Sequence, residues 1–292
     1  MTLTNAFRLP GPARSCCCFK HSKWRGHNGS GVVIRTDLLA TSSWIYLDLE
    51  KTGCTFLRNV LKSLFPPGSF LKSAKHSLMV RHCSQPKIMT IRDPYDYYFS
   101  LWRYGLDGKG GVYENLTAFF PRLSSRIYGE VSPEAFSAFL DFVLNSPTRY
   151  PSVSRVSWLP FGFDLYSTRI LSMIVPVNSR VSFLRALGSD FVSSEALLKA
   201  ATPYCPECLI RTDSLNSDFH ALAVSGRLSF MNLPQNWSEI FTLELPPVNF
   251  SSIQSLSLDS FLSSGWRSQI ECKSIVATWL LQRARDQFNQ EV

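Results

Sequence analysis

The chain has 292 residues, of which 45% are hydrophobic and 18% are charged, so a sizeable core is possible and extensive disorder is excluded. A formal net charge of +8 favours an anionic partner, such as a nucleotide, an acidic glycan, a nucleic acid or a membrane surface, without choosing among them. There is no long apolar run and no secretory signal pattern. We therefore expect no membrane span and a cytoplasmic location.

The first thirty residues differ from the remainder in composition. They contain prolines, the cysteine triplet Cys16–Cys18 and several basic residues, and they show no sustained helical or strand period. The pattern predicts a poorly ordered basic N-terminal arm over residues 1–30 and a single α/β domain over residues 31–292. Within that domain, Gly31–Leu39 is expected to form a short edge element.

The next stretch changes its period from strand to helix across a small turn. Trp44–Leu49 is mostly apolar or aromatic and predicts a buried strand, while apolar residues recur at helical spacing over 57–64. The turn between them, residues 51–55, reads KTGCT. A strand that ends in such a turn directs free backbone N–H groups and the positive end of a helix dipole at one point. Such a point suits a phosphate or sulfate, although an ordinary strand-to-helix turn has the same residue types.

A second strand, turn and helix follow the first. Lys87–Ile91 predicts a short strand, and Arg92-Asp93-Pro94 predicts a turn with proline at the first helical position. Tyr95–Tyr104 predicts an aromatic-rich helix. Because the two turns come after successive strands, they are expected to open on the same edge of one sheet.

Later parts of the chain carry weaker signals. The sequence predicts a loop with a short helix over 106–130, a helix over 133–144 and a buried strand over 170–177. Another core strand is expected at Cys208–Arg211, and a closing helix at Gln269–Phe288.

Taken together, the two motifs resemble the nucleotide-binding motifs of sulfotransferases that use 3′-phosphoadenosine 5′-phosphosulfate (PAPS), most closely the carbohydrate-type and bacterial members. In that family the motif K-x-G-[TC]-T holds the 5′ phosphosulfate. The second motif supplies an arginine and, two helical turns later, a serine to the 3′ phosphate. The resemblance covers residues 44–105. The implied cofactor-binding residues are Lys51, Thr52, Gly53, Cys54, Thr55, Phe56, Arg92 and Ser100, with Phe56 the candidate for stacking on adenine.

The resemblance also implies a fold and an activity. The fold is a P-loop-like α/β three-layer sandwich with a mainly parallel central sheet of about five strands. The activity is transfer of a sulfuryl group from PAPS to a hydroxyl or amine of an acceptor, with a carbohydrate as the expected acceptor and no metal required. Lys51 is expected to stabilise the departing nucleotide, and His76 in a Lys-His-Ser segment to act as the general base. His82 and Glu50 are the alternatives for that base.

Three other functions remain open. An inactive family member would bind a nucleotide or an acidic glycan without turnover. A nucleic-acid-binding protein is suggested only by charge and aromatic content, and the chain has no recognised nucleic-acid motif, so we expect no nucleic acid partner. The Cys205-Pro206-Glu207-Cys208 segment has C-x-x-C spacing, but it lacks a nearby second pair of ligands for zinc. We therefore predict no metal site.

Overall fold

The computed structural model describes residues 38–40, 44–65, 71–72, 85–145, 158–159, 162–188, 193–242 and 256–289. These residues all belong to one compact unit, Ile34–Val292.

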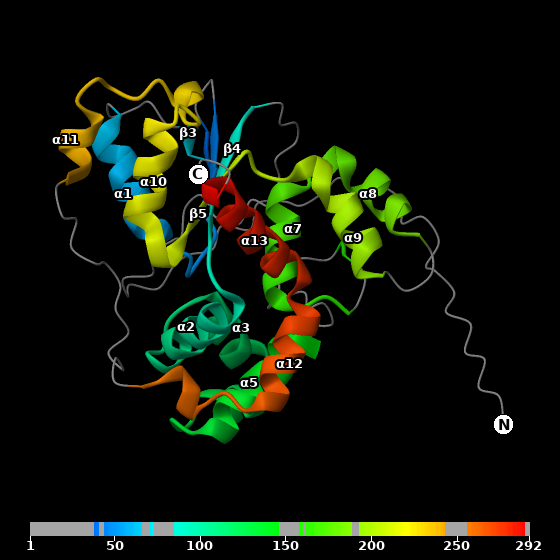
Figure 1. Cartoon of the computed structure of the whole chain (residues 1–292). Helices are drawn as coiled ribbons and strands as arrows, with labels where there is room; N and C mark the ends of the chain where they lie inside the picture. The colour runs from blue at the N-terminus through cyan, green and yellow to red at the C-terminus, as the bar shows by residue number, and fades with distance from the viewer. Residues whose placement is uncertain are drawn as a thin grey trace, which may run out of the picture. The chain divides into compact units, whose positions relative to one another are not determined.

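The centre of that unit is a five-stranded sheet with the order β3-β1-β2-β4-β5 (Figure 1). The strands β2, β4 and β5 run parallel to one another, and β1 and β3 are added antiparallel at one edge. The strand bounds are β1 Leu38–Ala40, β2 Ile45–Leu47, β3 Leu71–Lys72, β4 Lys87–Ile91 and β5 Cys208–Arg211.

The predicted α/β class is confirmed, but the parallel part of the sheet is limited to three strands, which is fewer than the mainly parallel sheet of five that we expected. The predicted strands at 44–49, 87–91 and 208–211 are all present. The first two are direct neighbours, with Ile45 opposite Lys87. Parallel pairing therefore brings the carboxyl ends of β2 and β4 to the same edge.

Most of the described chain is helical. The bounds are α1 Cys54–Leu64, α2 Pro94–Leu106, α3 Gly111–Phe119, α4 Pro121–Tyr128, α5 Pro133–Asn145, α7 Leu165–Ile174, α8 Arg180–Leu187, α9 Ser194–Ala201, α10 Leu215–Val224, α11 Trp237–Thr242, α12 Ser264–Lys273 and α13 Ile275–Asn289. Region 106–130 therefore forms two helices after α2, where the sequence predicted a loop and one short helix.

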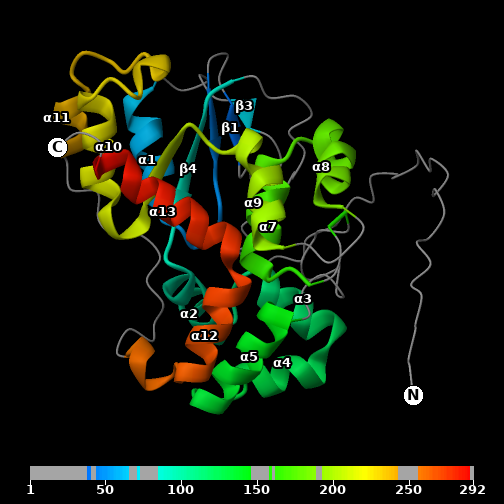
Figure 2. The ribbon, with the colours of Figure 1, turned by 45° about the vertical axis from the view of Figure 1, so that its right-hand side comes forward.

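Helices cover both faces of the parallel strands because side chains alternate between two hydrophobic clusters. Met89 and Ile91 of β4 face the larger cluster, which includes α2, α5, α7 and α13. Ile88 faces the smaller cluster with α1 and α10. Figures 1 and 2 show α1 and α10 on one side of the sheet and α7 and α13 on the other.

The predicted strand at 170–177 is wrong, because residues 170–174 are the last part of α7 and Val177 begins a short 3-10 helix, Val177–Ser179. Asp164 caps α7 by accepting a hydrogen bond from the Ser167 backbone N–H at 3.2 Å. All ten residues of α7 are buried, including the polar Ser167, Thr168, Arg169 and Ser172, so no contrast between an exposed polar face and a buried apolar face marks the helical period. Residues 170–177 are apolar except for Ser172, and such a segment cannot be distinguished from a buried strand by pattern.

The predicted closing helix at 269–288 is divided into α12 and α13 at Ser274. The Ser274 hydroxyl donates a hydrogen bond to the Asp164 carboxylate at 2.9 Å, and Ser274 is fully buried. This contact ties the break between the two helices to the start of α7.

Across the described part of the chain, no single helix has both the length and the apolar character needed to cross a membrane. Only α7 and Val177–Leu187 taken together meet that test, and they are bent by 106°.

Candidate functional site

The turn between β2 and α1 has an unusual backbone. Lys51 and Gly53 both adopt left-handed conformations, with φ of 64° and 82°. This conformation suits glycine, but it costs a residue such as lysine about 1 kcal/mol or more. A side chain at Gly53 is excluded for a second reason, because its Cβ would lie 2.6 Å from Leu215 Cδ1 of α10. The turn is thus held in one shape by the packing around it.

This shape presents the start of α1 toward the carboxyl edge of the sheet. Gly53 is the N-cap and supplies no capping side chain, and the first turn of α1 contains no acidic residue. The predicted ligand residues Cys54, Thr55 and Phe56 are all partly exposed. An anion here would meet the positive end of the helix dipole. The contacts of these three residues with a nucleotide remain predictions.

Thr52 requires a correction. Its side chain is fully buried, and its hydroxyl donates a hydrogen bond to the Leu49 carbonyl at 2.7 Å. The same hydroxyl lies 2.7 Å from the Thr90 hydroxyl of β4. The Thr52 hydroxyl therefore joins the turn after β2 to β4, and its proton is already donated within the fold.

The Lys51 side chain lies over the ring of Tyr104 in α2, with Nζ 4.2 Å from the ring centroid. Burial, followed by the positive charge of Arg92, lowers the pKa of Lys51 to about 8. No carboxylate among the described residues forms an ion pair with this ammonium group. A cation held in this way is stabilised by an arriving anion.

Arg92 begins the second turn, directly after β4. Its Nη1 donates a hydrogen bond to the Lys51 carbonyl at 3.1 Å, so the two predicted motifs are in contact. Burial is the main cause of a lowered pKa for Arg92. We refer to residues 50–55 together with 92–93 as the Lys51–Arg92 site.

The second turn is fixed by its own capping contacts. The Asp93 side chain accepts a hydrogen bond from the Tyr95 backbone N–H at 2.9 Å, and Pro94 occupies the first position of α2. Ser100 lies two turns along α2 from the start of that helix and is partly exposed. Its contact with a 3′ phosphate remains a prediction.

Sequence reasoning missed several residues of this site. Arg103 follows Ser100 by one turn of α2, and its charge contributes to lowering the pKa of both Lys51 and Arg92. Its helical spacing from Ser100 was a signal that could have identified it. Tyr104 offered no such signal, because its role depends on where the Lys51 side chain lies.

The three candidates for the general base have different outcomes. His76 and His82 lie outside the described residues. Glu50 forms an ion pair with Arg169 of α7. The Glu50 carboxylate therefore already has a cationic partner within the fold.

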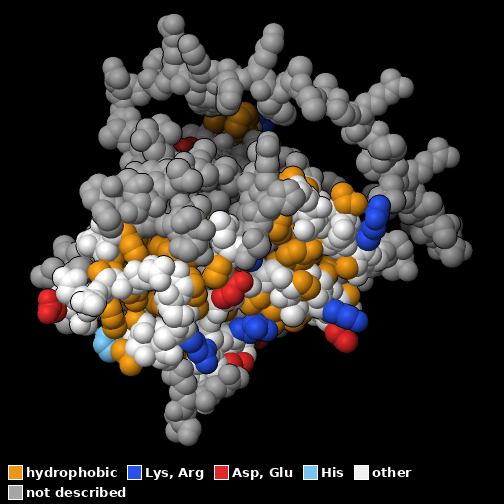
Figure 3. Space-filling view, turned by 90° about the horizontal axis from the view of Figure 1, so that it is seen from above, with side chains coloured by type: hydrophobic (Ala, Val, Ile, Leu, Met, Phe, Trp, Pro, Cys, Tyr) orange, Lys and Arg blue, Asp and Glu red, His pale blue; other side chains and the backbone are white. Residues whose placement is uncertain are grey.

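A cavity of about 250 Å³ lies elsewhere, beside the start of β5, and is lined by residues including Glu207, Arg227, Arg283 and Asp286. Its lining carries both signs of charge. Figure 3 shows the face seen from above Figure 1, where Lys and Arg side chains lie next to Asp and Glu. Such a mixed surface does not select an anion.

The nearby C-x-x-C cysteines are free thiols. Burial raises the pKa of Cys205 and brings that of Cys208 to about 12, which keeps both thiols protonated near neutral pH. Within the described ranges, no group of three or more His, Cys, Asp or Glu side chains is arranged to hold a metal ion.

Comparisons with known protein families, with characterised proteins and with solved structures find no match to this chain.

Proposed function

We propose that the protein is a PAPS-dependent sulfotransferase with a P-loop-like α/β fold, and that the Lys51–Arg92 site binds the nucleotide. The observation that carries the proposal is the hydrogen bond from Arg92 Nη1 to the Lys51 carbonyl, because it joins the two motifs at the carboxyl edge of neighbouring parallel strands. In open α/β sheets this edge is where ligands bind. The N-terminus of α1 and two partly buried cations suit a ligand with several negative charges.

Each residue of the site has a distinct task in this proposal. PAPS supplies an activated sulfuryl group whose departure leaves negative charge on the bridging oxygen of the nucleotide. Lys51 stabilises that charge, and backbone N–H groups of Gly53 to Phe56 hold the 5′ phosphate. Arg92 binds the 3′ phosphate by a forked pair of hydrogen bonds, and Ser100 donates a further one.

The acceptor in this proposal is a hydroxyl or amine compound, with a carbohydrate as the first choice. His76 removes the acceptor proton. Glu50 is the weaker candidate because its carboxylate already pairs with Arg169. Replacement of His76 by alanine should abolish transfer and leave nucleotide affinity nearly unchanged, because the proton comes from the acceptor. A fully active His76→Ala protein would remove this assignment.

The second candidate function is binding of a nucleotide or an acidic glycan without turnover. The same pair of partly buried cations supports it, since binding needs the positive site alone.

Two measurements on the purified protein separate these functions. Calorimetric titration with 3′-phosphoadenosine 5′-phosphate should show saturable binding that Arg92→Ala weakens. Radiolabelled sulfate from PAPS should then appear on a member of a broad panel of sugars, amino sugars and phenols. Tight binding without transfer to any acceptor supports the inactive binder. Absence of nucleotide binding refutes both nucleotide-binding proposals.

A further inference from the structure

Helix α7 presents two polar side chains to the Lys51–Arg92 site from within the core. Tyr166 and Arg169 are three residues apart, which places them on the same face of the helix. Tyr166 is fully buried and Arg169 is only 8% exposed. Burying an arginine and a tyrosine hydroxyl costs free energy unless both are well bonded, so their partners are informative.

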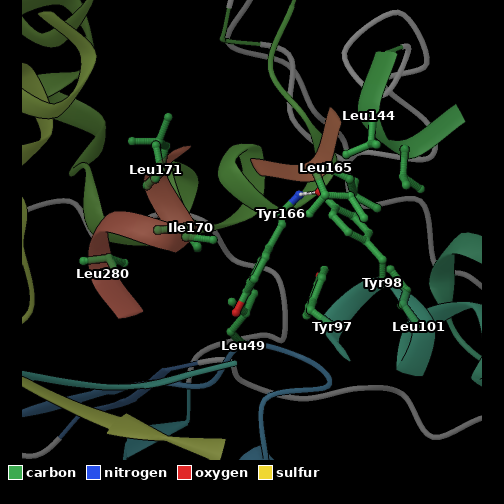
Figure 4. Packing of buried hydrophobic residues seen from close by; sticks show 14 of the residues in the cluster. Leu49, Tyr97, Tyr98, Leu101, Leu144, Leu165, Tyr166, Ile170, Leu171 and Leu280 are labelled. Atoms are coloured by element: carbon green, nitrogen blue, oxygen red, sulfur yellow. Dashed lines mark hydrogen bonds between the residues drawn. The ribbon is translucent and has the colours of Figure 1, made fainter. Parts of the chain in front are cut away.

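Tyr166 holds the backbone of the second turn. Its hydroxyl donates to the Arg92 carbonyl at 3.0 Å and accepts from the Arg92 backbone N–H at 3.0 Å. The ring is stacked on Tyr97 of α2, with centroids 3.6 Å apart and planes within 6°. Figure 4 shows the Tyr166 side chain reaching toward Leu49 with Tyr97 beside it. The Arg92 backbone, two residues before α2, is thus held at both its N–H and its carbonyl.

Arg169 holds the first turn. Its Nη1 forms an ion pair with Glu50, the residue immediately before Lys51, and also donates to the Tyr97 hydroxyl at 3.0 Å. Tyr97 therefore connects the two contacts, because its ring packs on Tyr166 and its hydroxyl meets Arg169. One face of α7 consequently binds the residue before Lys51 and the backbone of Arg92.

We infer that Tyr166 and Arg169 are positioning residues that fix the separation of the two turns and so set the spacing at which two phosphate groups of one nucleotide are bound. The nucleotide part of this inference rests on the proposed function. The physical reason is pre-organisation, because a site whose two halves are already held apart at the bound distance loses less freedom on binding. Neither residue touches the nucleotide in this assignment.

The main test compares Tyr166→Phe with Tyr98→Phe. Both variants keep the aromatic ring and remove a buried hydroxyl. The Tyr98 hydroxyl bonds to Asp164 and accepts from the Tyr166 backbone N–H at 3.3 Å, so its loss affects the start of α7 without removing a contact to either turn, which makes it the control. Tyr166→Phe should weaken binding of 3′-phosphoadenosine 5′-phosphate about ten-fold and should speed amide hydrogen exchange at Arg92. Tyr98→Phe should lower the melting temperature without either effect.

A second pair of variants tests the first turn. Arg169→Met should speed amide exchange over residues 50–53 and reduce the rate of sulfuryl transfer. Arg169→Lys keeps a cation for Glu50, so its amide exchange over residues 50–53 and its transfer rate should return part of the way to the wild-type values. Unchanged exchange over residues 50–53 in Arg169→Met would overturn the role of Arg169.

The outcomes separate this inference from the proposed function. If the wild type binds the nucleotide and Tyr166→Phe keeps full affinity and slow Arg92 exchange, the positioning role is overturned and the proposed function stands. If the wild type binds no nucleotide, the proposed function and the nucleotide role fail together. Faster amide hydrogen exchange at Arg92 in Tyr166→Phe would then still support the positioning of the two turns by α7.

Discussion

Arg92 and Arg211 lie at the same edge of the parallel sheet, and their side chains have different partners. At the end of β5, Arg211 is held by Asp218, with Nη2 and Nε donating to the carboxylate at 2.7 and 2.9 Å. Hydrogen bonding to Asp218 raises the pKa of Arg211. After β4, burial instead lowers the pKa of Arg92, and its side chain donates to a neutral carbonyl oxygen.

The difference indicates which cation has a structural role. Arg211 and Asp218 neutralise each other within the fold, so no ligand is needed to complete them. Lys51 and Arg92 stand close together, and the positive charge of Arg92 adds to burial in lowering the pKa of Lys51. In the described residues no ion pair offsets either charge. An anionic ligand would supply the missing negative charge, so the following variants are expected to separate the two turns.

The largest effect is expected for Lys51→Ala. Its contact strengthens as charge develops on the leaving nucleotide, so kcat should fall by about two orders of magnitude or more, on the order of 3 kcal/mol. Single-turnover transfer from PAPS measures this step. Lys109→Ala is the control, because that lysine is exposed and pairs with Asp107. Equal loss in both variants would point to a general effect of positive charge.

Arg92→Ala should mainly lower the affinity for the nucleotide, because Arg92 is assigned to the 3′ phosphate and that group does not react. The loss of a forked, charge-assisted contact should weaken binding of 3′-phosphoadenosine 5′-phosphate by about 2 kcal/mol, or roughly thirty-fold. Calorimetry at fixed salt provides the value, and Arg92→Lys should recover only part of it. Unchanged affinity in Arg92→Ala would contradict the assignment of the 3′ phosphate.

Arg211→Ala should act on stability and leave the affinity of the folded protein unchanged. The variant leaves the Asp218 carboxylate, which is 2% exposed, without its guanidinium partner. We expect the free energy of unfolding to fall by about 2 kcal/mol in urea denaturation. A weaker affinity for the nucleotide at temperatures where the variant is fully folded would show that the third turn also belongs to the site.

The pH dependence of binding should be smaller and should depend on Lys51. Its pKa of about 8 in the free protein means that the ammonium group loses its proton as pH rises above 8. A bound anion favours the protonated form, so nucleotide affinity should decrease above pH 8, by up to about ten-fold per pH unit. Titration from pH 7 to 9.5 measures the slope. Lys51→Met should remove the slope, and a persistent slope would assign it to another group.

The same shift predicts a change in stability. Between pH 8 and the ordinary lysine pKa near 10.5, the unfolded chain holds the Lys51 proton more strongly than the folded protein does. The protonated Lys51 therefore lowers the free energy of unfolding at pH values below 8. This loss of stability disappears as the pH rises from 8 to about 10.5. A lowered lysine pKa is expected in a cationic site whose negative partner is a bound ligand.

Much of the site was readable from local sequence. The strand β4 and the helices α1 and α2 follow from apolar periodicity, from Pro94 at a helix start and from Gly53 at a turn. The expectation that both turns open on one edge needed only the rule that parallel strands share their carboxyl ends. The contact between Arg92 and the Lys51 carbonyl confirms that expectation.

Only the tertiary structure decided what surrounds these turns. The sequence places Thr52 in a phosphate motif, yet its hydroxyl bonds within the fold, because the pairing of β2 with β4 brings Thr90 beside the turn. The partners Tyr166 and Arg169 come from a segment whose helix is buried on all sides, so no periodic signal marks it. The chain by itself thus determined which backbone turns form and what charge they carry. Long-range packing decided which of those groups are already bonded within the protein and which are left for a ligand, since hydrogen bonds between distant segments leave no local pattern.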